Sequence, residues 1–207
     1  MVGACHDQIL AVLPDHSYGL HAGKYWAAGK ILALKEISSP CVILDMDAVV
    51  WGRLNLDDCD AMAAHTEELN PEIYPSFDFF DMSPRYQMEN WDFSVLPLNT
   101  SFLYIKNEEV KKHYVSQALR FMQMERNTPD IGARCMVFAE QRMLAMCLKQ
   151  MNIKPDVLVE RYDKTQKNFI HLWSYKHEVF HDAAKAQEMI ELCRQRIHEV
   201  KKSLNEE

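Results

Sequence analysis

The sequence is organised around one apolar stretch that ends in two acids, Cys41-Val42-Ile43-Leu44-Asp45-Met46-Asp47-Ala48-Val49-Val50-Trp51. A continuous apolar run rich in β-branched residues is typical of a strand buried on both faces of a parallel sheet. Residues two apart on an extended chain project to one face, so Asp45 and Asp47 converge while Met46 points away. Open α/β sheets bind their ligands beyond the carboxyl ends of the strands. We therefore expect a site at these carboxylates, where a cation, a proton or a metal-bound phosphate relieves their mutual repulsion.

Length and composition are those of an ordinary globular protein. The chain has 207 residues, 48% hydrophobic and 26% charged, so we expect a single domain over 1–207 with a substantial core. A net charge of −7 disfavours a general binder of nucleic acid or of anionic membranes. No apolar run approaches the roughly 18–20 residues that cross a bilayer, and no signal peptide is recognisable, so we expect no membrane span. The six cysteines are scattered without a CxxC pair. This favours reduced core residues of a cytoplasmic protein and disfavours a cysteine zinc site.

The apolar spacing predicts a mixture of helices and strands. A helix over 21–37 carries an apolar stripe and stops before Pro40, because the residue before a proline disfavours the helical conformation. Asn107 is the expected N-cap of a helix that runs to about Met124. A helix directly before a buried strand is half of a βαβ unit, so the predicted fold class is α/β. The other expected elements are a strand or helix turn over 9–13, an acidic helix over 57–69, a functional loop or a short strand near 77–80 within 70–97, strands over 101–105, 157–159 and 169–173, a helix over 136–151 and a closing amphipathic helix over 182–204.

The central stretch resembles the opening motif of the haloacid-dehalogenase phosphatases, an apolar strand followed by Asp-x-Asp-Gly-(Thr/Val). That resemblance implies Asp45 as a nucleophile on phosphorus and Asp47 as the general acid and base. The chain departs from the motif in three ways. Ala48 replaces the glycine, the motif does not open the chain, and no later strand ends in the paired acids that hold magnesium. A phosphatase is the first alternative function.

More of the chain, roughly 22–180, resembles the glycosyltransferases of the GT-A fold. Their central strand ends in an Asp-x-Asp motif that holds Mn²⁺ or Mg²⁺ against the diphosphate of a nucleotide sugar. The stretches that carry the resemblance are the helix with Trp26-Ala27-Ala28-Gly29-Lys30, the strand Pro40–Val50, Leu98-Asn99-Thr100-Ser101-Phe102-Leu103-Tyr104, Phe138-Ala139-Glu140-Gln141 with Leu144, and His171-Leu172-Trp173-Ser174-Tyr175-Lys176. The last is similar to a late stretch of the glycogenin-like branch, in which the histidine binds the metal and the lysine meets phosphate.

The resemblance implies a GT-A-like (Rossmann-like) mixed sheet flanked by helices. It also implies a shortened nucleotide-binding N-terminal lobe, of which 1–20 is the residual segment, because the Asp-x-Asp strand begins as early as Cys41. The implied reaction moves a sugar from a UDP- or GDP-type donor to an unknown acceptor, with Mn²⁺ or Mg²⁺ as cofactor. The implied site has Asp45, Asp47 and His171 as metal ligands, Glu140 and Gln141 as catalytic residues, and Trp26, Lys30, Asp45, Asn99 and Lys176 as substrate contacts.

The chemistry of these residue types agrees with such a site. A bound divalent cation stabilises the charge that develops on a diphosphate leaving group. Two carboxylates and an imidazole favour Mn²⁺, which accepts nitrogen ligands better than Mg²⁺ does. Lys30 and Lys176 add positive charge for phosphate oxygens, and Asn99 offers both a donor and an acceptor to sugar hydroxyls. Glu140 is the carboxylate for a general base or for orienting the acceptor hydroxyl.

Each of these residues also has a plainer interpretation. Trp26 and His171 are candidates for the core, Asn99 for a turn, and Lys30, Glu140 and Gln141 for solvated helix faces; His177 and His181 are rival metal ligands. A third class of function is a non-catalytic binding or assembly protein. In that case the stripe of Ile190, Cys193, Ile197 and Val200 on the closing helix serves a homodimer.

Overall fold

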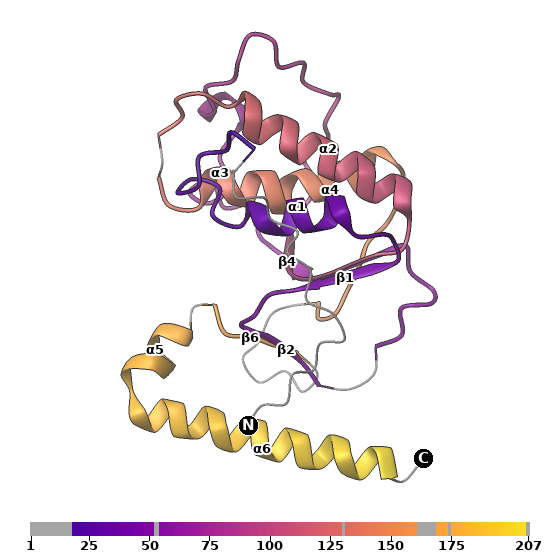
Figure 1. Cartoon of the computed structure of the whole chain (residues 1–207), viewed down its shortest axis with the longest axis vertical. Coiled ribbons are helices and arrows are strands. Elements are labelled where there is room, and N and C mark those ends of the chain that lie inside the picture. The colour runs from indigo at the N-terminus through magenta and orange to yellow at the C-terminus, as the bar shows by residue number, and fades with distance from the viewer. Residues whose placement is uncertain (1–17, 52–53, 130, 161–168, 174, 206–207) are drawn as a thin grey trace.

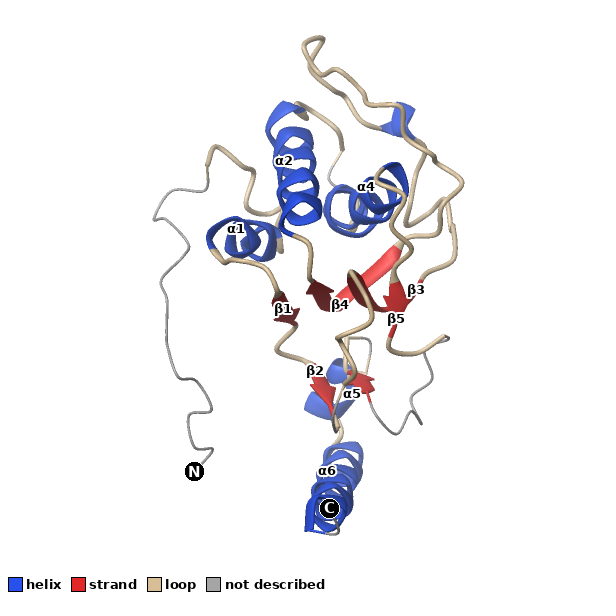
Figure 2. Ribbon diagram, turned by 90° about the vertical axis from the view of Figure 1, so that its right-hand side faces the viewer, coloured by secondary structure: helices blue, strands red, loops and turns tan. Residues whose placement is uncertain are grey.

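Strand β4 (Leu98–Ile105) is an inner strand of a four-stranded sheet (Figures 1 and 2). The computed structural model describes residues 18–51, 54–129, 131–160, 169–173 and 175–205. The strand order is β1 (Cys41–Leu44), β4, β3 (Ala61–Thr66) and β5 (Asp156–Val157). β4 pairs antiparallel with both of its neighbours, and β3 pairs parallel with β5. All eight residues of β4 are buried, so the polar side chains within this strand lie inside the molecule.

Helices cover one face of this sheet (Figure 2). They are α1 (Ala28–Glu36), α2 (Glu108–Met124) and a continuous helical segment made of α3 (Arg134–Val137), the π-helical turn η2 (Phe138–Arg142) and α4 (Met143–Gln150). Side chains alternate between the two faces of a strand. Leu103 and Ile105 of β4 accordingly pack into the core beneath the helices, whereas Phe102 and Tyr104 pack into a smaller core on the other face.

The smaller core also holds a two-stranded sheet, formed by β2 (Ala48–Val50) and β6 (Phe169–His171) in antiparallel register. β6 leads toward α5 (Lys176–His181) and α6 (Ala183–Asn205). In both views α6 lies at the opposite end of the molecule from α1, α2 and α4 (Figures 1 and 2). Within the part of the chain that the structure describes, no helix is long and apolar enough to cross a bilayer.

The apolar stretch Cys41–Leu44 is a strand, as predicted. The prediction that this strand is parallel to its neighbours and buried on both faces is wrong. β1 lies at the edge of the sheet, pairs antiparallel with β4, and leaves Val42 and Leu44 about half exposed, at 44% and 45%. Cys41 and Ile43 alone pack against the core. An apolar run indicates a strand but does not say how many of its faces are covered. The buried central position belongs instead to β4, whose polar residues make it look less like a core strand.

One further prediction is wrong. The segment 57–69 is not an acidic helix, since Ala61–Thr66 form β3. Alanine favours helix intrinsically, but burial and pairing with β4 override that preference here. In the segment 70–97, for which the sequence favours a functional loop or a short strand, the structure has no strand near 77–80 but a 3₁₀ turn, η1 (Phe77–Phe79), in which the Phe77 ring packs against Phe121 and Phe138.

The remaining elements agree with the sequence. Asn107 caps α2 through its side-chain oxygen, which accepts hydrogen bonds from the backbone N–H groups of Glu109 and Val110. The helices near 21–37, 136–151 and 182–204 and the strands near 101–105, 157–159 and 169–173 are present, although the first helix begins only at Ala28 and both late strands are shorter than expected. The expected segment 9–13 lies outside the described residues. These elements together confirm a mixed α/β chain.

Candidate metal and diphosphate site

Asp45 and Asp47 lie in the tight turn between β1 and β2. The backbone N–H of Asp45 donates to the Ser101 carbonyl at 2.8 Å, which extends the pairing of β1 with β4 by one residue. The Ala48 N–H then donates back to the Asp45 carbonyl at 3.0 Å and closes the turn. The chain was expected to be extended through both acids, but it turns between them. The two carboxylates nevertheless converge, and Met46 between them is fully exposed and points away.

His171 joins the two acids because β6 pairs with β2. Its Cα lies opposite Ala48 in the register, and the N–H of Leu172 donates to the Asp47 carbonyl at 2.8 Å. The imidazole Nε2 is 3.6 Å from Asp47 Oδ1 and 3.9 Å from Asp45 Oδ2. One potential ligand atom from each residue lies within 4.8 Å of the other two. These three side chains, which we call the metal cluster, are the only such group of metal-binding side chains among the described residues.

Burial lowers the pKa of His171 below its usual value, although the charges of Asp47 and Asp45 oppose this effect. A neutral imidazole keeps a lone pair free for a cation, which a protonated one does not. Burial would by itself raise the pKa of Asp47, but the hydrogen bond from Lys176 and the charges of His171 and Lys176 outweigh it and lower that pKa. At neutral pH these two shifts favour an anionic carboxylate at Asp47 and a neutral imidazole at His171.

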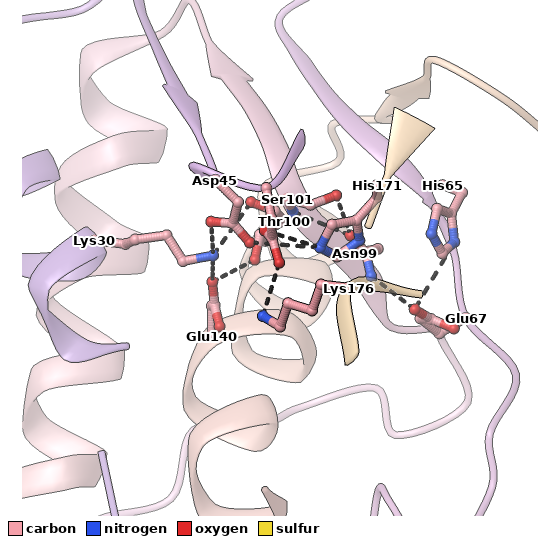
Figure 3. Close-up of polar contacts among 11 residues, drawn as sticks. Lys30, Asp45, His65, Glu67, Asn99, Thr100, Ser101, Glu140, His171 and Lys176 are labelled. Atoms are coloured by element: carbon pink, nitrogen blue, oxygen red, sulfur yellow. Dashed lines mark hydrogen bonds and ion pairs between the residues drawn. The ribbon is translucent and has the colours of Figure 1, made fainter. Parts of the chain in front are cut away.

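Each acid of the metal cluster forms an ion pair with one lysine (Figure 3). Lys176, the first residue of α5, places Nζ 2.8 Å from Asp47 Oδ2. Lys30 reaches from α1 and places Nζ 2.8 Å from Asp45 Oδ1. Burial alone would lower the pKa of Lys30, but the charges of Glu140 and Asp45 outweigh it and raise that pKa. The raised pKa keeps the ammonium group of Lys30 charged at neutral pH, next to the place where a metal-bound anion would lie.

Glu140 lies at the same site, on the π-helical turn η2. Its Oε1 forms an ion pair with Lys30 and accepts a 2.5 Å hydrogen bond from Thr100 Oγ1, and the side chain is almost fully buried. Gln141 does not share this contact, since its Oε1 accepts a 2.5 Å hydrogen bond from the hydroxyl of Tyr74. The structure therefore brings the carboxylate of Glu140, but not the amide of Gln141, into contact with Lys30.

Asn99 belongs to a second polar group beside the metal cluster, on β4 and β3 (Figure 3). Its Oδ1 accepts hydrogen bonds from the backbone N–H and the hydroxyl of Ser101, and its Nδ2 donates to Glu67 Oε1 at 2.8 Å. Glu67 also lies 3.8 Å from Nδ1 of the buried His65. None of Glu67, His65, Thr100 and Ser101 was predicted from the sequence as a site residue. The signal that would have found them is the row of polar residues inside an otherwise apolar strand.

The other predicted contacts lie apart from the metal cluster. The Trp26 side chain is 60% exposed, on the turn before α1. His177 and His181 stack on each other at 4.2 Å between ring centroids, and the His177 carbonyl lies 2.8 Å from Nδ1 of His181. Neither histidine belongs to the metal cluster, so His171 is the imidazole that the structure brings to the two acids.

The donor set of the metal cluster fits a hard or borderline divalent cation. Two carboxylate oxygens and one imidazole nitrogen are ligands that Mn²⁺ accepts, and no thiol takes part that would favour a softer metal. Comparison of the chain with protein-family models, with curated proteins and with solved structures gave no match. The function is therefore inferred from the geometry and chemistry of the site.

Proposed function

We propose that this chain is a metal-dependent glycosyltransferase that takes a sugar from a nucleotide-diphosphate donor. The observation that carries the proposal is the convergence of Asp45, Asp47 and His171 with one lysine paired to each acid. A cation held by the metal cluster would neutralise a diphosphate, Lys176 would bind one of its remaining oxygens, and Lys30 adds positive charge beside the site. Such an array of charges is suited to a leaving group that departs with negative charge.

Each residue has a defined task in this proposal. Asp45, Asp47 and His171 would hold Mn²⁺ or Mg²⁺, which supplies Lewis-acid stabilisation of the leaving diphosphate. Lys176 would exchange its contact with Asp47 for a phosphate oxygen. The second amide N–H of Asn99 is not used by the hydrogen bond to Glu67 and would bind a hydroxyl of the donor sugar.

The arrangement of the sheet also supports a GT-A-like fold. The Asp-x-Asp turn follows a strand of a mixed sheet, helices cover one face of that sheet, and a late strand carries the histidine to the two acids. The donor belongs to the UDP or GDP type in this proposal, and the acceptor is not specified by any residue of the site.

Donor hydrolysis and transfer test the proposal. The protein should release UDP or GDP from a nucleotide sugar when Mn²⁺ is present, and EDTA or Asp47→Ala should abolish that release. Asp60→Ala replaces an exposed aspartate outside the metal cluster and should leave it unchanged. Turnover of p-nitrophenyl phosphate that is lost in Asp45→Asn would instead establish the phosphatase alternative. Neither activity, with every nucleotide sugar tried, would favour a non-catalytic binding protein.

A further inference from the structure

Lys30 is shared between two acids rather than paired with one (Figure 3). Its ammonium group contacts Asp45 Oδ1 and Glu140 Oε1, and it also donates to the Thr100 carbonyl at 3.4 Å. An ammonium group has three N–H donors, so these three acceptors account for all of them. The position of Lys30 is therefore determined jointly by a residue of the metal cluster and by a residue outside it.

Glu140 is held rigidly enough to act as the fixed partner. Its side chain is 3% exposed, the same Oε1 that meets Lys30 accepts the hydrogen bond from Thr100, and its backbone carbonyl accepts one from the hydroxyl of Tyr114 at 2.9 Å. The residue lies on a π-helical turn between two α-helical segments, a local irregularity that is common at functional sites. Asp45, in contrast, lies on an exposed turn and is 25% accessible. Of the two acids that share Lys30, Glu140 is therefore the one whose side chain is fixed in place.

We propose that Glu140 is a positioning residue that holds and neutralises Lys30, and thereby leaves Asp45 able to bind a divalent cation. A lysine that paired with Asp45 alone would compete with the cation for the same carboxylate. The charge of Glu140 offsets that of Lys30, so the metal cluster keeps the negative charge that a cation needs. This assigns Glu140 a role through Lys30 instead of the general-base role expected from the sequence, and it rests on the proposed function for the identity of the metal cluster.

The proposal predicts effects of opposite sign for two neighbouring variants. Glu140→Gln removes the charge that neutralises Lys30, so the affinity for Mn²⁺ should fall about tenfold. Lys30→Met removes the competitor, so the affinity for Mn²⁺ should rise about tenfold. Because Glu140 acts through Lys30, the loss caused by Glu140→Gln should be at least about threefold smaller in the Lys30→Met background than in the wild-type protein.

Electron paramagnetic resonance of free Mn²⁺ measures these affinities with the metal alone, so the readout does not depend on a donor or an acceptor. Lys35→Met is the matched control, because Lys35 is exposed on the same helix and lies over the ring of Tyr18, 4.8 Å from its centroid. Its affinity should equal that of the wild-type protein. Circular dichroism confirms that each variant is folded.

Several outcomes would overturn the proposal. Equal losses from Glu140→Gln in both backgrounds would show that Glu140 acts on the cation directly, and an unchanged affinity in Glu140→Gln would show that it does not act at all. If Glu140→Gln does not fold, the Lys30→Met variant tests the proposal by itself. An affinity of Lys30→Met for Mn²⁺ that is equal to or weaker than that of the wild-type protein would contradict competition between Lys30 and the cation for Asp45. If the wild-type protein binds Mn²⁺, any of these results overturns only the role of Glu140 and leaves the proposed function standing. A wild-type protein that binds no Mn²⁺ overturns both the role of Glu140 and the proposed function.

Discussion

Replacing Glu125 with Gln removes the charge from a buried ion pair that ties the segment before α1 to the end of α2. Glu125 Oε2 lies 2.8 Å from Lys24 Nζ, with side chains that are 2% and 7% exposed. Glu125 also accepts a hydrogen bond from the Thr128 N–H at 2.6 Å, and Lys24 donates to the Thr128 carbonyl at 3.0 Å. Removing one partner of a buried ion pair costs about 3–5 kcal/mol, because the other charge is left buried and unpaired. We expect the lower end of this range, since the amide oxygen of Gln replaces one of the two carboxylate oxygens and still accepts one of these hydrogen bonds.

For a domain of this size each kcal/mol lowers the melting temperature by about 2–4 °C, so Glu125→Gln should melt roughly 6–12 °C below the wild-type protein. Circular dichroism during heating measures this difference. The matched control is Glu191→Gln, which removes the same charge from an exposed pair with Arg194 on α6, 3.7 Å apart. Exposed pairs contribute at most about 1 kcal/mol, so the control should melt within roughly 4 °C of the wild-type protein. A Glu125→Gln variant that melts no lower than the Glu191→Gln control would refute the argument.

Three further predictions concern stability. Burial alone would raise the pKa of Glu125, but hydrogen bonds from Lys24 and Thr128 outweigh it and lower that pKa. The stability that Glu125 contributes is therefore present above the pKa of the unfolded chain and is lost as pH falls through the lower folded pKa. Urea titrations should show the difference between wild-type protein and Glu125→Gln shrinking below about pH 4.5, and a constant difference would contradict this. Phe138→Ala should lose about 3–5 kcal/mol in urea unfolding, because its ring packs 4.6 Å from that of Phe80 and 4.9 Å from that of Phe121 between centroids. A loss below about 1 kcal/mol would mean that the cavity collapses. Asn107→Ala should lose about 1 kcal/mol through the missing cap, whereas Asn107→Asp should stay close to wild type; equal losses would contradict the capping role.

The best-predicted elements are those whose signals are local. The helix α2 has an N-cap at Asn107, acids in its first turn and an apolar stripe, and each of these acts within a few residues of sequence. The strand β1 was recognised from its apolar run, but its place at the sheet edge depends on its pairing with β4, which local sequence does not encode. For β3 the tertiary environment outweighs the helical preference of its alanines.

In the candidate site, too, the residues with a local sequence signal were predicted, and the contacts that depend on strand pairing were not. Asp45 and Asp47 were predicted from their spacing, and His171 from the order of motifs that resembles GT-A enzymes; the structure brings all three together. The contact between Thr100 and Glu140 was not predicted, because it needs both the register of β4 and the π-helical turn η2. The polar group around Glu67 was missed for a similar reason, since Glu67 reaches Asn99 only through the pairing of β3 with β4.

A crystal structure of the protein soaked with Mn²⁺ and UDP tests the central claim most directly. Anomalous scattering locates manganese without reference to the model of the protein. We predict one strong peak within coordination distance of Asp45, Asp47 and His171, with the diphosphate of UDP bound to the same ion and Lys176 turned from Asp47 toward a phosphate oxygen. A peak elsewhere, or no peak at a Mn²⁺ concentration that saturates binding in solution, would contradict the account.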